Sequence, residues 1–129
     1  MSFSNYLENE VLDHVFGGNA YSAPSTIYLS LHTADPGEDA SGGGEISTTG
    51  SAYVRKSASF SVSGNTATTS AAVEWDQATS NWGTISHVGV WDASASGNMM
   101  AYSSLTESKT VNSGDVIRIN SGQLTITLN

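Results

Sequence analysis

Short apolar segments with a two-residue period, separated by turns rich in glycine, asparagine and serine, most constrain the fold of this chain. In residues 26–32, Ile27, Leu29 and Leu31 alternate with more polar residues, the pattern of a strand with one buried face. Residues 84–91 carry apolar residues on both faces and are expected to form the central strand. About seven or eight such segments recur at intervals of roughly 8 to 12 residues, which predicts a mainly β fold, an antiparallel β-sandwich of jelly-roll or immunoglobulin-like type or a small barrel.

The composition excludes several classes of protein. With 129 residues the chain is expected to form one domain. It has no cysteine, four basic residues and a net charge of -8, which disfavours disulfides, thiolate metal sites and a phosphate-binding surface. Nucleic acid is therefore not an expected partner. Neither a membrane-spanning apolar stretch nor the basic start of a signal peptide is evident, so we expect synthesis in a cytoplasm and no membrane partner.

One segment departs from the β pattern, because residues 4–16 read as an amphipathic helix. Asn5 is expected to cap it, with Glu8 completing a capping box, and Gly17 and Gly18 are expected to end it with a left-handed residue. The apolar residues recur at helical spacing and form the candidate assembly interface: Leu7, Val11, Leu12, Val15 and Phe16.

A β-domain does not need such a helix to close its core. We therefore divide the chain into an N-terminal amphipathic helix, residues 1–18, and a single β-sandwich domain, residues 19–129. The helix is expected either to pack on its own domain or to dock onto another subunit. A membrane-surface role is disfavoured, since Glu8, Glu10 and Asp13 would be repelled by anionic lipid.

Candidate catalytic and metal-binding groups are few. The loop 35–50 contains Asp35, Glu38, Asp39 and Glu45, which could collect oxygen ligands for a calcium ion, but the spacing of an EF-hand is absent. The three histidines have no metal-ligand spacing. Glu74 and Asp76 flank Trp75, as two carboxylates for glycoside cleavage could, but without a further pocket signal solvated acids at a strand end are the favoured interpretation. We therefore expect no enzyme activity, no cofactor and no metal.

Two tryptophans are candidate surface contacts. Trp82 is expected on a loop between Asn81 and Gly83, where its ring either stacks on a glycan or protein partner or plugs the core beneath the loop. Trp75 is the second candidate, at a strand end beside the acidic residues. A carbohydrate-binding module that recognises a host surface glycan is the functional alternative that these rings support.

Four stretches of the chain resemble a family of small tailed-bacteriophage virion proteins commonly labelled tail-fibre or minor tail proteins. They are Met1–Gly18, Ile27–Pro36, Trp82–Asp92 and Ser108–Asp115. The resemblance implies a non-enzymatic structural role in a virion, with other virion proteins as partners and many symmetric copies or a homo-oligomer. Because the chain has no repeat to build a long shaft, we expect a compact tail, fibre or baseplate module. A capsid decoration (cement) protein that clamps capsid subunits is the alternative.

Overall fold

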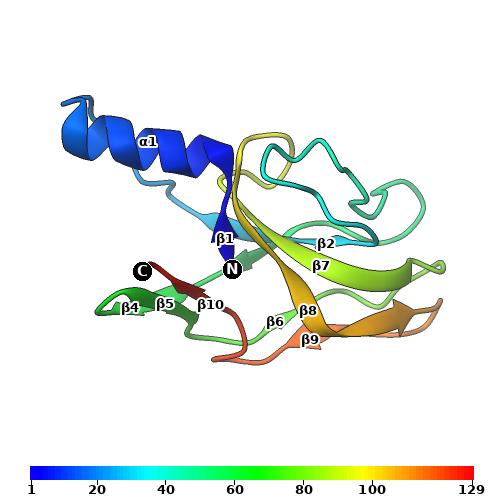
Figure 1. Ribbon diagram of the computed structural model, residues 1–129. Coiled ribbons are helices and arrows are strands. Elements are labelled where there is room, and N and C mark those ends of the chain that lie inside the picture. The colour runs from blue at the N-terminus through cyan, green and yellow to red at the C-terminus, as the bar shows by residue number, and fades with distance from the viewer.

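The structure is a computed structural model that describes residues 1–129, and it consists of ten β-strands and one helix (Figure 1). The elements in chain order are β1 (Ser2–Phe3), α1 (Asn5–Phe16), β2 (Ile27–His32), β3 (Lys56–Ala58), β4 (Phe60–Ser63), β5 (Thr66–Thr69), β6 (Val73–Glu74), β7 (Gly83–Trp91), β8 (Met99–Val111), β9 (Arg118–Ile119) and β10 (Thr125–Thr127).

The strands form two layers, which confirms the predicted β-sandwich with an N-terminal helix. One layer is a five-stranded antiparallel sheet in the order β1-β8-β7-β2-β3, and β7 pairs with β2 on one side and β8 on the other. The other layer contains the three-stranded sheet β10-β5-β4 and the two-stranded sheet β6-β9 (Figure 1). The expectation of a central strand at residues 84–91 is therefore confirmed.

One stretch that reads as a single strand in the sequence belongs to both layers in the structure. Residues 53–62 are apolar enough to suggest one strand, but β3 pairs with β2 in the large sheet and β4 pairs with β5 in the small one. The chain passes between the layers at Ser59, which lies outside both strands. The alternation of apolar residues does not show that the chain changes the strand with which it pairs, because the side chains keep their two-residue period on either side of the crossing.

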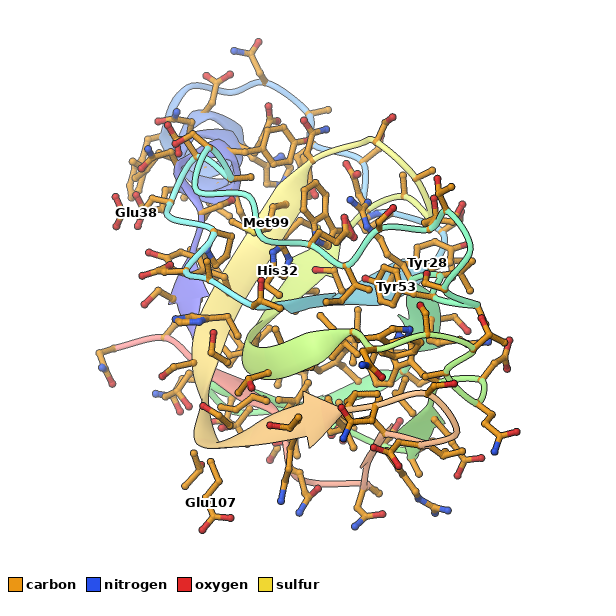
Figure 2. The ribbon with its side chains drawn as sticks, turned by 90° about the vertical axis from the view of Figure 1, so that its right-hand side faces the viewer. Tyr28, His32, Glu38, Tyr53, Met99 and Glu107 are labelled. Carbon is orange, nitrogen blue, oxygen red and sulfur yellow. The ribbon has the colours of Figure 1, made fainter.

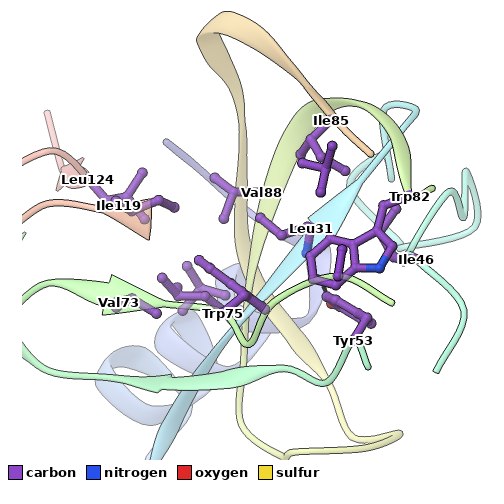
Figure 3. Packing of buried hydrophobic residues seen from close by; sticks show 14 of the residues in the cluster. Leu31, Ile46, Tyr53, Val73, Trp75, Trp82, Ile85, Val88, Ile119 and Leu124 are labelled. Carbon is purple, nitrogen blue, oxygen red and sulfur yellow. Dashed lines mark hydrogen bonds between the residues drawn. The ribbon is translucent and has the colours of Figure 1, made fainter. Parts of the chain in front are cut away.

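The core lies between the layers. Leu29, Leu31 and Val88 of the large sheet are fully buried, and they face residues of the second layer such as Trp75 and Leu124 (Figure 3). The apolar members of β2 thus occupy the face that their alternation predicts.

The start of α1 is fixed by contacts with the large sheet. Ser4, not Asn5, is the N-cap, and its hydroxyl accepts a hydrogen bond from the Leu7 amide at 3.2 Å. The same hydroxyl donates to the Met99 carbonyl, and the Ser4 amide donates to the Met100 carbonyl at 2.8 Å. The predicted Asn5–Glu8 capping box is therefore wrong, because the tertiary contacts hold Ser4 extended as the continuation of β1. At the other end, Gly18 adopts φ +77°, the left-handed conformation expected there.

The two hydrogen bonds of the buried Ser4 hydroxyl lead to a prediction for stability. Ser4→Ala should lower the free energy of unfolding by about 1–2 kcal/mol, because it removes the helix cap and also the hydroxyl that donates to the Met99 carbonyl of β8. Urea denaturation followed by circular dichroism measures the loss. Asn5→Ala is the matched control, since the Asn5 side chain is exposed, and it should change stability by less than about 0.5 kcal/mol. A larger effect of Asn5→Ala than of Ser4→Ala would contradict the assignment of the cap.

Candidate assembly surface

The helix α1 is attached to the β-body at its first turn and projects away from it (Figure 1). The attachment consists of the Ser4 contacts and of β1, whose Ser2 and Phe3 pair with Tyr102 and Ala101 of β8. The Asn5 amide also donates to the Glu38 carbonyl at 2.9 Å, which joins the helix to the 35–50 loop. No residue of α1 is buried. A helix of 12 residues is about 18 Å long, so its last turns lie well beyond the sheet that anchors the first.

The apolar stripe of the helix divides into two parts with different surroundings. Leu7 is partly buried against the core cluster, and Val11 is half-buried. Leu12, Val15 and Phe16 are exposed, with 57%, 60% and 83% of their surface accessible. Because positions i, i+3 and i+4 share one face of a helix, these three side chains form a continuous apolar surface, which we call the helix tip patch.

The chain that follows the helix returns to the body and leaves the helix tip patch uncovered. Asn19 closes the turn by donating its side-chain amide to the Asp13 carboxylate at 2.9 and 3.0 Å. Tyr21 then lies against Met100 of β8, with its hydroxyl 3.8 Å from the sulfur. The polar contacts of this segment therefore involve Asp13 and His14 of the helix and the sheet, while Phe16 stays largely in solvent.

The helix is also electrostatically unpartnered. Glu8, Glu10 and Asp13 take part in none of the five ion pairs within the chain. Since the Asp13 carboxylate accepts from Asn19, Glu8 and Glu10 are the acidic side chains of the helix without a partner in the chain.

The two tryptophans expected as surface contacts lie in the core. Trp75 is 1% exposed and Trp82 is 5% exposed. Trp82 packs edge-on against Tyr53 with ring centroids 5.5 Å apart, and its indole nitrogen donates to the Ser51 carbonyl at 2.8 Å (Figure 3). Neither ring presents a face to solvent, so the expectation of a stacking surface at Trp75 and Trp82 is corrected. The core-plug alternative holds for Trp82 because a backbone carbonyl satisfies its only polar atom.

The outer face of β2 and β7 carries a buried polar network that sequence alternation did not reveal. Trp91 donates its indole N–H to the Ser30 hydroxyl at 2.7 Å, and that hydroxyl lies 2.7 Å from His32 Nε2. His32 Nδ1 lies 2.8 Å from the Gly43 carbonyl, so Nδ1 carries the proton and Nε2 accepts from Ser30. Gly89 leaves room for this network, because a Cβ there would lie 2.6 Å from the Ser30 oxygen.

The 35–50 loop covers this network, with Arg55 holding the cover in place. The Arg55 guanidinium forms a bidentate pair with the Glu45 carboxylate, two of its N–O distances being 2.8 Å. It lies 3.7 Å from the centre of the Trp91 ring and donates to the Ser96 carbonyl at 2.8 Å. Arg55 thereby joins this loop to the 92–98 loop, and its side chain is only 7% exposed. Figure 2 shows His32, which the loop contacts through Gly43, beside this loop. The sequence contains one indication of this network, the polar residues Ser30 and His32 on the same face of a strand. From the alternation alone, that face is expected to lie in solvent.

The acidic residues proposed as calcium ligands have separate partners. Glu45 is engaged by Arg55 and also accepts from the Tyr53 hydroxyl at 3.1 Å. Asp35 and Asp39 each accept from a backbone amide two residues further along the loop. No group of three or more His, Asp or Glu side chains in the structure is placed to hold a metal ion.

The pair considered for glycoside cleavage lies on the surface in ion pairs. Asp76 contacts Lys56 at 3.1 Å and Glu74 contacts Arg118 at 3.6 Å. Trp75, between them in sequence, points into the core. The three residues therefore do not combine into a sugar-binding cleft.

These observations define a β-sandwich module whose uncovered feature is the apolar end of a projecting helix. The model of the Gp80 family, described as podophage GP4 fiber I protein gp80, matches residues 2–127. The chain therefore belongs to this family of podophage fibre proteins. No curated protein matches the chain. The helix α1 is neither long enough nor apolar enough to cross a membrane.

The buried histidine leads to a prediction for pH dependence. Burial lowers the pKa of His32, and nearby Arg55 and His87 act in the same direction, whereas Glu45 and the Gly43 carbonyl favour the charged ring. The unfolded chain therefore binds a proton near pH 6.5 that the folded chain resists, and the free energy of unfolding should fall as the pH drops below about 6.5.

The measurement is urea denaturation at pH 7.5 and at several values down to pH 5.5. His32→Gln should show a smaller loss of stability across this window than the wild type. His14→Gln, which alters an exposed histidine of the helix, should keep the wild-type dependence. Equal slopes for the wild type and His32→Gln would show that His32 does not carry the effect.

Proposed function

We propose that the protein is a compact, non-enzymatic structural module of the tail fibre of a podophage, and that the helix tip patch attaches it to other structural proteins of the virion. The observation that carries the proposal is the exposure of Leu12, Val15 and Phe16 on a helix that buries none of its residues. The family assignment supports a role in the virion and a fibre location.

The physical argument is the cost of leaving this surface in water. Burying one side chain of the size of Leu, Val or Phe stabilises an interface by about 1.5–3 kcal/mol when the burial is complete. An anchored helix presents the three side chains in a fixed arrangement, so docking orders few additional residues. This arrangement is typical of recognition in which an amphipathic helix lies in an apolar groove of its partner.

The alternatives receive less support from the structure. The two rings that the sequence suggested for stacking on a host glycan, Trp75 and Trp82, are both buried. Capsid decoration would use the same projecting helix, but the family description names a fibre protein. We therefore propose the tail fibre, with a decoration role as the outcome that virion imaging would reveal.

The proposal predicts the effect of one charge placed on the helix tip patch. Phe16→Glu should fold as the wild type does, since Phe16 is 83% exposed, but it should be lost from assembled virions. The expected weakening of attachment is about 30-fold or more, because an anchor worth at least 2 kcal/mol is replaced by a charge. The measurement is complementation of a phage that lacks this protein, followed by quantitative immunoblotting of purified particles.

Val62→Glu provides the matched control for this experiment. Val62 lies on β4 and is 75% exposed, so the substitution adds the same charge at a comparably exposed apolar residue of the small sheet. It should be incorporated as the wild type is. Normal incorporation of Phe16→Glu would overturn the proposed role of the helix tip patch. Immunogold labelling of the wild-type particles then distinguishes the tail from the capsid.

A further inference from the structure

A groove between the two layers runs along the second half of β8. It is open to solvent, has a volume of about 960 Å³ and lies between β8 and the segment 115–125 of the other layer. It reaches the core, because the buried side chains of Leu31 and Leu124 belong to its lining. Exposed residues of both charges, Glu107 and Lys109 among them, also line it. The groove, which we call the β8 groove, therefore has an apolar floor and a polar rim with charges of both signs.

One wall of the β8 groove is the edge of a strand. Five consecutive residues of β8, Ser103 to Glu107, line the groove. Because successive side chains of a strand point to opposite faces of the sheet, a run of consecutive residues means that the edge of β8, with its backbone groups, forms this wall. β1 pairs with β8 only at Ala101 and Tyr102, and no other strand lies on that side. From Ser103 onward this edge is therefore free to pair with an extended backbone.

A bulge in the same stretch removes β8 from its other neighbour as well. The partners of Ser104 and Lys109 lie two residues apart on β7, whereas these two residues lie five apart on β8. The residues 105–108 of β8 thus fall outside the regular ladder, which bends the strand. Along the groove, part of the β8 backbone has no regular partner on either side.

The opposite wall contains a second free edge, that of β10. This strand is the outermost one of the small sheet and pairs only with β5. Its Thr125 lines the groove, and the Thr125 carbonyl accepts from the Met1 amino group at 3.3 Å. In Figure 1 the N-terminus lies between β8 and β10. β1 therefore occupies a space between two sheet edges, and the β8 groove continues that space beyond Met1.

We propose that the β8 groove binds an extended peptide segment of another protein chain, which pairs antiparallel with the free edge of β8 in line with β1. An extended backbone is the chemistry that recognises a strand edge, because it supplies donors and acceptors at the same repeat. The mixed lining fits the same occupant, since alternate side chains of a strand meet the apolar floor and the polar rim in turn. This surface is separate from the helix tip patch, and the proposal does not depend on the function proposed for that patch.

The contacts of β1 define the direction of the backbone groups along this edge. The Ser4 amide donates to the Met100 carbonyl. Ser2, two residues earlier, stands opposite Tyr102, two residues later on β8. Because residues of an antiparallel strand alternate in the side to which their amide and carbonyl groups point, the next residue of β8 with both groups on this edge is Ser104. An occupant in line with β1 is therefore expected to bond first to Ser104.

The side chains of β1 define which residues of the occupant face the core. Met1 and Phe3 pack against the core cluster, whereas Ser2 is exposed. In a strand that continues this alternation, the residue opposite Ser104 points to solvent and the next one points into the groove. The expected occupant thus carries apolar side chains at every second position.

The β8 edge of a second copy is disfavoured as the occupant. Bulges and charged side chains, here Glu107 and Lys109, are features that prevent identical strand edges from pairing with each other. The edge also lies between two layers, where a single extended segment enters but a second sheet with its own covering layer does not. These features favour a strand from a chain of different sequence.

The test uses a fluorescein-labelled peptide of the sequence Val-Thr-Val-Thr-Val-Thr, whose binding to the unmodified protein is followed by fluorescence anisotropy. The peptide should bind, and a peptide with proline in place of each threonine should bind about 10-fold more weakly or not at all, because it lacks the amides that pair with β8. Ser104→Pro should weaken binding of the first peptide by a similar factor. Proline is tolerated on a strand edge when the lost amide faces solvent, and circular dichroism verifies the fold. Phe16→Glu is the matched control and should bind the peptide as the wild type does, since it alters the helix tip patch alone.

A second measurement does not depend on the folding of a groove variant. The same six residues, Val-Thr-Val-Thr-Val-Thr, are joined directly before Met1, so that the valines continue the inward side of Met1 and Phe3. The control extension Thr-Val-Thr-Val-Thr-Val has the same composition but turns every side chain to the other face. The first extension should fill the groove, slow hydrogen exchange of the Ser104 amide by about 10-fold and prevent binding of the free peptide, whereas the control should do neither.

Three results would overturn the proposal. They are a free peptide that does not bind at millimolar concentration, equal binding of the valine–threonine and valine–proline peptides, and equal behaviour of the two extensions. The first would show that the groove is no acceptor for a strand, the second that the backbone amides play no part, and the third that the register of β1 does not continue into the groove.

Discussion

The pairing of β7 with strands on both sides is the constraint on which the rest of the structure depends. The inner face of β7 contributes Val88 to the core. On its outer face, Trp91 donates to the Ser30 hydroxyl beside His32. Gly89 permits the close approach of these polar groups. Both faces of the sheet are thus covered where the long loops and the helix are attached to it, and the nearly buried Arg55 side chain is paired with Glu45.

The attachment of the helix depends on the same sheet. The N-terminal strand pairs with β8, and the buried Ser4 caps α1 with bonds to the same strand. The first turn is held by the sheet, whereas Leu12, Val15 and Phe16 face solvent. A small acidic β-sandwich thereby presents an apolar surface in a fixed direction, as the proposed attachment in a podophage fibre requires.

The predictions from the sequence were wrong or incomplete where the position of a side chain depended on partners distant along the chain. Trp82 stands in a loop beside a glycine and could equally face a ligand or the core, and the position of the Ser51 carbonyl decided between them. Ser30 and His32 have the alternation of a solvated face, yet a loop clasped by Arg55 and Glu45 covers them. The cap at Ser4 depends on the carbonyl of Met99, 95 residues away. Each of these contacts forms only when the layers are assembled.

The sequence by itself determined the secondary-structure class, the central strand, the turns that end in left-handed glycine and the existence of an amphipathic helix, because these follow from local periodicity and backbone preference. It also determined the virion family through stretches that span the chain. Only the tertiary structure decided which apolar residues are covered. Leu7 and Phe16 both belong to the apolar set of the helix, but they are nine residues apart and point to opposite sides of it. Leu7 packs on the core whereas Phe16 stays in solvent, because the burial of a side chain depends on what the fold places beside it.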